Sequence, residues 1–155
     1  VRTAAGRLQR VVAALLTLFR SGAELQRQPV DVAALISRLP VEGLTIEVQV
    51  PQALSADADL LAAALLNLFD NSLRNSATQV TVSTPTATTL RLDDNGPGVS
   101  AGRRSELQRA LAAQAYEGST GLGLMLADLI ARAHGGVVLI PDVSRGFAVE
   151  LRLGY

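Results

Sequence analysis

Short segments of alternating hydrophobic and polar residues constrain the fold more than any other feature of the sequence. Leu44–Val50 alternates as expected for a half-buried strand, and Gln79–Ser83 and Thr88–Asp93 repeat the pattern as a predicted hairpin. Two further strands are predicted at Val137–Ile140 and Phe147–Leu153, on either side of a turn. Because strands that follow one another in the sequence usually pair, the sheet is expected to be mostly antiparallel.

Segments of helical composition separate these strands. The longest runs from about Ala58 to Asn75, and Ser55 or Asp57 can cap its N-terminus. Shorter helices are expected at Arg103–Ala115 and Leu124–His134. Helices combined with an antiparallel sheet cover one of its faces. We therefore expect an α/β two-layer sandwich with a mixed, mostly antiparallel sheet and helices on one face, rather than a doubly wound parallel sheet.

An N-terminal helix is predicted to precede this sandwich. Hydrophobic residues recur at three- and four-residue steps from Leu8 to Phe19, which is a coiled-coil-like stripe. The polar stretch Glu24–Gln28 and Pro29 then indicate a linker, and Val30–Leu39 is expected to form a short strand and a helix. The stripe allows two interpretations, a helix packed on its own domain or one helix of a dimerising hairpin. The expected division is residues 1–24 and 25–155.

Composition excludes several classes of function. The 155 residues suffice for one ordinary domain, and 14 basic against 14 acidic residues disfavour a nucleic-acid partner. The chain has no cysteine and one histidine, His134, so thiol catalysis and multi-histidine metal sites are excluded. His134 lies before Gly135-Gly136 at a predicted helix end, where we expect it to cap carbonyls or to pack.

The long helix carries an unusual polar face. Asn67, Asn71, Arg74 and Asn75 lie at helical spacing, although asparagine is a mediocre helix former. An amide oxygen can bind a hard cation such as Mg²⁺, and Arg74 could reach a phosphate held by that cation. A merely solvated polar face is the alternative interpretation.

Two glycine motifs follow. Asp94-Asn95-Gly96-Pro97-Gly98 comes after a strand, and its glycines allow a close approach to a flat ligand beside a carboxylate. Gly118-Ser119-Thr120-Gly121-Leu122-Gly123-Leu124 opens a helix, where backbone N–H groups form an anion site. Each alone is a weak signal, because the first is also an ordinary turn and the second a glycine-rich cap.

The three motifs in this order resemble the Bergerat-fold ATPases, which include gyrase, MutL and the sensor histidine kinases. Asn67–Ser76 resembles the asparagine box of the histidine kinases, Asp94–Gly98 their first glycine box and Gly121–Leu124 their second. The resemblance covers about Pro29 to Leu153. Residues 1–24 resemble the second helix of the hairpin that dimerises these kinases and carries their phosphoacceptor histidine.

The resemblance implies a site for ATP and Mg²⁺. It makes Asn71 the metal ligand, with Asn67 on the phosphate side and Arg74 in place of the family's usual lysine. Asp94 would bind the adenine amine, and Ser100–Glu117 would form a flexible lid. The remaining residues expected to contact the nucleotide are Asn75, Gly96, Gly98, Ser119, Thr120, Gly121, Leu122, Gly123 and Leu124.

The resemblance also implies the type of reaction. Water-activating members of the superfamily have Glu where this chain has Asn67, and an amide cannot act as a general base. The γ-phosphate is therefore expected to be transferred to a histidine that this sequence lacks. Implied partners are that histidine's helix, a response regulator and a second copy in the full-length kinase. We expect a cytoplasmic domain of a protein anchored in the bacterial inner membrane.

Two other functions fit the same motifs. One is a non-catalytic interaction module that keeps the fold and signals by docking. The other is an anti-sigma-type serine kinase of the same superfamily, which Asn67 and the N-terminal helix disfavour.

Overall fold

A computed structural model describes residues 25–50, 52–116 and 121–154. The predicted N-terminal helix, and with it the first of the two expected units, lies outside the described residues. Ser119 and Thr120 also lie outside them. Within the described part of the chain, no helix combines the length and the hydropathy that a bilayer crossing requires.

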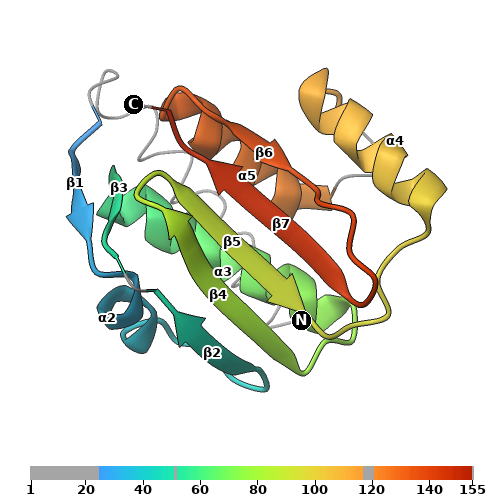
Figure 1. Ribbon diagram of the computed structural model, residues 1–155, viewed down its shortest axis with the longest axis horizontal. Helices are drawn as coiled ribbons and strands as arrows, with labels where there is room; N and C mark the ends of the chain where they lie inside the picture. Colours follow the sequence, from blue (N-terminus) through green and yellow to red (C-terminus); the bar gives the residue numbers. More distant parts are fainter. Residues whose placement is uncertain (1–24, 51, 117–120, 155) are drawn as a thin grey trace.

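A five-stranded sheet forms one layer of the fold (Figure 1). Its strand order is β2-β4-β5-β7-β6, and the pairs β4–β5, β5–β7 and β6–β7 are antiparallel. The mixed, mostly antiparallel sheet is therefore confirmed. β2 pairs with β4 in parallel, because α3 lies between them in the chain and returns it to the same end of the sheet. The strands are β2 (Thr45–Gln49), β4 (Gln79–Thr86), β5 (Thr89–Asp94), β6 (Val137–Leu139) and β7 (Phe147–Arg152).

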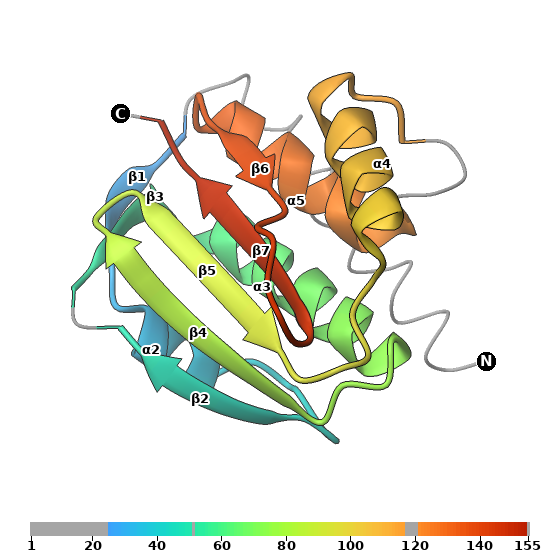
Figure 2. The ribbon, with the colours of Figure 1, turned by 45° about the vertical axis from the view of Figure 1, so that its right-hand side comes forward.

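Helices form the second layer, as predicted. α3 (Ala58–Arg74) and α5 (Gly121–Ala133) lie side by side behind the sheet (Figures 1 and 2). Of the two candidate caps for α3, Asp57 is the one used, since its side chain accepts hydrogen bonds from the N–H groups of Asp59 and Leu60. The hydrophobic core between the layers includes Leu61, Leu65, Leu90, Leu126, Ile130 and Leu151.

The N-terminal part of the domain differs from the sequence prediction. β1 (Arg27–Val30) begins inside the segment interpreted as a linker, earlier than the strand expected from Val30. It pairs antiparallel with β3 (Leu54–Asp57), which was not predicted. Both strands are short, and their pairing joins segments far apart in the sequence, so no local alternation predicts this pairing. The short helix α2 (Val32–Ser37) follows β1.

Two element boundaries also differ. β4 continues through Pro85 to Thr86, and the pairing with β5 shifts register between Ser83 and Thr86. α5 begins at Gly121 rather than Leu124, so Gly121–Leu124 of the second glycine motif form the first helical turn instead of a loop. Packing against α3 offsets the poor helix propensity of glycine there.

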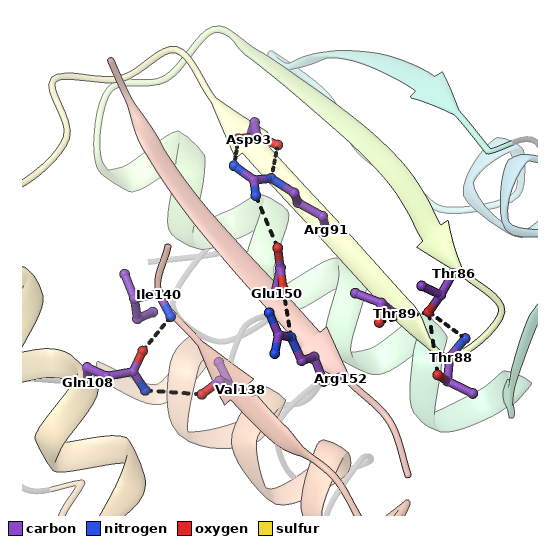
Figure 3. A network of polar contacts seen from close by, with 10 residues as sticks. All are labelled: Thr86, Thr88, Thr89, Arg91, Asp93, Gln108, Val138, Ile140, Glu150 and Arg152. Carbon is purple, nitrogen blue, oxygen red and sulfur yellow. Dashed lines mark hydrogen bonds and ion pairs between the residues drawn. The ribbon is translucent and has the colours of Figure 1, made fainter. Parts of the chain in front are cut away.

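The sheet face opposite the helices is polar and is held by ion pairs (Figure 3). Arg91 makes two hydrogen bonds to Asp93, of 2.8 and 3.0 Å, and one of 3.0 Å to Glu150. Glu150 also accepts a 3.0 Å hydrogen bond from Arg152. These contacts link β5 to β7 on the face that alternation assigns to polar residues.

Candidate functional site

The polar face of α3 passes from the buried to the exposed side of the molecule. Asn67 is 1% exposed, and its side-chain amide donates a 2.8 Å hydrogen bond to the Ala63 carbonyl. Asn67 Oδ1 is buried and has no hydrogen-bond partner among the described residues. Asn71 is half-buried, whereas Arg74 and Asn75 are exposed at the helix end. A buried acceptor without a donor is costly, so the free oxygen of Asn67 is suited to a water or to a ligand group.

The start of α5 lies directly against this face. A Cβ atom at Gly123 would lie 3.0 Å from the Asn67 carbonyl oxygen and 3.4 Å from Asn71 Cβ. Leu124 is 3% exposed and packs in the core. The backbone of Gly121 and Leu122 forms the beginning of the same helix. The second glycine motif and the asparagine face are therefore in contact, although they are far apart in the sequence.

The first glycine motif approaches the other end of the face. Asp94 ends β5, and its Oδ1 accepts a 2.9 Å hydrogen bond from the Gly96 N–H. Its Oδ2 accepts a 3.1 Å hydrogen bond from Ser72 Oγ. A Cβ atom at Gly96 would lie 3.1 Å from the Asn75 carbonyl oxygen and 3.2 Å from Asp94 Oδ1. The missing side chain thus leaves an Asp94 oxygen open beside α3.

Asn95 anchors this loop to the start of β4. Its Oδ1 accepts hydrogen bonds from the N–H groups of Thr78 and Gln79, at 2.8 and 2.9 Å. Its Nδ2 donates to Thr78 Oγ1 at 2.8 Å. The side chain of Asn95 therefore fixes the loop after Asp94 to the start of β4.

Gly98 contacts the turn between β6 and β7 rather than an open space. A Cβ atom there would lie 2.4 Å from the Gly146 carbonyl oxygen. Gly146 in turn adopts a φ of +69°, and its backbone lies so near β5 that an added Cβ atom would overlap the Asp94 carbonyl. No sequence pattern predicts a role for Gly146, Asn95 or Ser72. Ser72 directly follows the expected metal ligand, and that adjacency was the one available signal.

α4 (Ala101–Ala112), within the segment expected to form a lid, is docked on the edge of the sheet. Gln108 donates to the Val138 carbonyl at 3.3 Å and accepts from the Ile140 N–H at 2.7 Å (Figure 3). Arg104 donates to the Ile140 carbonyl at 3.0 Å. The side chains of α4 therefore satisfy the free edge of β6.

A buried carboxylate joins the end of this segment to α5. Asp128 is 0% exposed, and its Oδ2 accepts hydrogen bonds from Tyr116 at 2.6 Å and from Arg132 at 2.9 Å. Arg132 also donates to the Leu111 carbonyl at 2.8 Å, which caps α4. Burial and the hydrogen bond to Asp128 raise the pKa of Tyr116 above 10.0. The cluster holds the ends of α4 and α5 together.

His134 has the structural role that the sequence predicts. It is 3% exposed, with Nδ1 2.8 Å from the Ile130 carbonyl and Nε2 3.0 Å from the Asp57 N–H. A carbonyl can only accept and an N–H can only donate, so the proton lies on Nδ1 and the ring is neutral. Burial lowers the pKa of His134 below 6.5. The side chain ties α5 to the start of α3.

Amide groups, rather than clustered acids, are what this site offers to a cation. The described residues contain no group of three or more histidines or acids that could hold a metal. Mg²⁺, however, usually takes one or two protein ligands together with waters and substrate phosphates. The Asn71 amide beside α5 and the unpartnered Asn67 oxygen fit such a shared site.

Residues 56–155 match the sequence family described as histidine kinase-, DNA gyrase B-, and HSP90-like ATPase. This chain belongs to that family of ATPases. The match includes every element that builds the site, from the end of β3 to β7.

Relatives of this ATPase domain include kinases from mycobacteria. “Probable sensor histidine kinase TcrY” of Mycobacterium tuberculosis is 33% identical over 172 residues, which cover 95% of this chain and 36% of TcrY. The chain therefore spans about a third of that relative's length. The ATP-binding domain of PrrB from the same organism superposes with a TM-score of 0.62 at 25% identity, covering 82% of this chain and 96% of PrrB. Full-length ShkA in complex with AMPPNP superposes with a TM-score of 0.59 at 25% identity, covering 97% of this chain and 37% of ShkA.

Proposed function

We propose that this chain is the ATP-binding catalytic domain of a sensor histidine kinase, which transfers the γ-phosphate of ATP to a histidine. The observation that carries the proposal is the convergence of three separate segments. Gly123 packs on the backbone that bears Asn67 and Asn71, and Gly96 packs on Asn75 one turn further along α3. A nucleotide bound here would have its base near Asp94 and its phosphates near the start of α5.

The base end of the site has the chemistry for adenine. The Asp94 carboxylate lies at the end of β5 and can only accept hydrogen bonds, whereas the adenine amine is a donor. Gly96 leaves that carboxylate uncovered. Asp94 is thus the group that would identify the purine.

The phosphate end combines a helix N-terminus with amides and a cation. N–H groups in the first turn of α5 suit an anion, and exposed Arg74 lies one turn beyond Asn71. Asn71, with Asn67 beside it, would hold Mg²⁺ together with the phosphates. The ion would neutralise the charge that develops on the transferred phosphoryl group.

Residue 67 favours transfer over hydrolysis. The Asn67 amide nitrogen is engaged with the Ala63 carbonyl, and an amide oxygen is too weak a base to activate water. A neutral imidazole needs no such activation, because its free nitrogen can attack the γ-phosphorus while the bond to the ADP oxygen breaks. His134 is buried with both ring nitrogens engaged, so the acceptor is a histidine supplied by another segment or chain.

The wider assignment rests on the relatives. TcrY is named as a sensor histidine kinase, and the structure of ShkA contains an ATP analogue. By this likeness the phosphoacceptor would lie on a helical hairpin and pass its phosphate to a response regulator. The whole kinase would then be a homodimer anchored in the membrane, with this domain in the cytoplasm.

Calorimetry and a transfer assay test the proposal. The purified chain should bind ATP more tightly with Mg²⁺ than without it. Mixed with radiolabelled ATP and a phosphoacceptor hairpin of the sensor histidine kinase family, it should produce an acid-labile phosphohistidine on the hairpin. Absence of binding up to millimolar ATP, with the fold intact, would contradict the proposal and favour a docking module.

A further inference from the structure

Ser72 connects the two halves of the site. It follows Asn71 on α3, it is 6% exposed, and its Oγ donates a 3.1 Å hydrogen bond to Asp94 Oδ2. The two residues are 22 positions apart in the sequence. This is a direct side-chain link between the helix that would hold the metal and the carboxylate that would identify the base.

The Asp94 carboxylate is held by two donors at the same time. Gly96 N–H bonds to Oδ1 at 2.9 Å and Ser72 Oγ–H bonds to Oδ2, so rotation about the Cβ–Cγ bond would break both contacts. Each carboxylate oxygen has two lone-pair sites, so each can still accept one more hydrogen bond. The held group therefore offers acceptors in a fixed direction and no donor.

A fixed acceptor distinguishes between purines. A 6-amino purine presents an N–H donor to it, whereas a 6-oxo purine presents a second acceptor that is repelled. This discrimination depends on orientation, because a carboxylate that can turn away relieves the repulsion and also aligns less well with the amine.

We propose that Ser72 is a positioning residue that determines the purine specificity of this site by holding the Asp94 carboxylate in the orientation that accepts a 6-amino group. The inference rests on the proposed function, since it assigns Asp94 to the base. It gives a role to a residue of the first motif to which the motif resemblance assigns none. It also commits the Ser72 hydroxyl proton to Asp94, so that this proton is not offered to the 6-oxo group of guanine.

Removal of the hydroxyl should change selectivity more than stability. In Ser72→Ala, calorimetry with Mg²⁺ should show ATP bound about tenfold more weakly, from the loss of one hydrogen bond to a charged group, and GTP bound equally or more tightly. Ser72→Thr retains a hydroxyl and should restore most of the preference for ATP. Ser37→Ala is the matched control, because Ser37 is an exposed helix residue whose Oγ, among the described residues, donates a hydrogen bond to the Ala34 carbonyl of the same helix.

The outcomes separate this inference from the proposed function. If the unmodified chain binds no nucleotide, the proposed function fails and the inference fails with it. If the unmodified chain prefers ATP and Ser72→Ala keeps the same ratio of ATP to GTP affinity, the inference alone is overturned. An equal loss of both affinities would also overturn it, because that result reports general damage to the site. A narrowed ratio that Ser72→Thr restores supports it.

Discussion

Replacement of Gly146 by alanine should be among the most damaging single-methyl additions in this domain. A Cβ atom there would lie 1.8 Å from the Asp94 carbonyl oxygen and 2.9 Å from the Asp94 carbonyl carbon. To restore even a 3.0 Å contact, the turn or β5 would have to move by about 1.2 Å. Both partners are backbone, so no side chain can rotate away.

Two costs contribute to the loss of stability. Alanine at a φ of +69° costs about 1–2 kcal/mol relative to ordinary backbone. Relief of the overlap costs about 1–3 kcal/mol, as for other overpacked interiors. We therefore expect Gly146→Ala to lower the free energy of unfolding by about 2–5 kcal/mol.

Two other glycines separate these costs. Gly43 has a φ of +80° but its nearest neighbour is a flexible leucine atom at 3.6 Å, so Gly43→Ala should show only the backbone cost. Gly102 has nothing within 4 Å and lies inside α4, so Gly102→Ala should stabilise by about 0.5–1 kcal/mol.

Urea unfolding followed by circular dichroism measures all three variants. The reasoning requires a larger loss for Gly146→Ala than for Gly43→Ala, and a gain for Gly102→Ala. Equal losses for Gly146→Ala and Gly43→Ala would show that the turn does not press against β5. Because the overlap is with Asp94, the Gly146→Ala molecules that remain folded should also bind ATP less tightly.

Three further predictions concern single residues. Asn71→Ala should remove the Mg²⁺-dependent part of ATP binding without lowering the unfolding midpoint; titrations with and without Mg²⁺ check this, and unchanged affinity would contradict the metal role. Because burial lowers the pKa of His134 below 6.5, the unfolded chain takes up the proton first, so stability is complete above pH 6.5 and decreases below it. His134→Gln should flatten that decrease in urea titrations at several pH values, and an unchanged slope would refute it. Arg132→Met should lower the free energy of unfolding by about 2–3 kcal/mol, because it leaves the Asp128 carboxylate buried without its cation. Adding Asp128→Asn to that variant should recover part of the lost stability. No recovery would argue against the ion pair.

Local patterns were sufficient for most of the architecture. Alternation predicted three strands of the main sheet, and a turn between two hydrophobic segments predicted the other two. Helical composition, with Ser55 or Asp57 as the candidate cap, predicted α3. β3 was missed, and β1 was expected only from Val30, because each is short and becomes a strand only through pairing with the other. Pro29, which suggests a linker in isolation, is accommodated in that two-stranded sheet.

The candidate site was predicted as three motifs but not as one arrangement. Helical spacing places Asn67 and Asn71 on one face whatever the rest of the chain does. Their contact with Gly123 depends on the packing of α5 against α3. The functional roles of these residues remain proposals that the binding experiments test.

Residue types and their spacing along the chain therefore determined the elements, the family and the chemical groups available for a nucleotide. Tertiary structure decided which of those groups meet, that Ser72 and Gly146 are both in contact with Asp94, and that His134 is buried as a neutral ring. The physical reason is the distance along the chain over which each kind of interaction acts. Periodicity and capping act within a few residues, whereas hydrogen bonds and close packing between distant segments exist only after the sheet and helices have assembled.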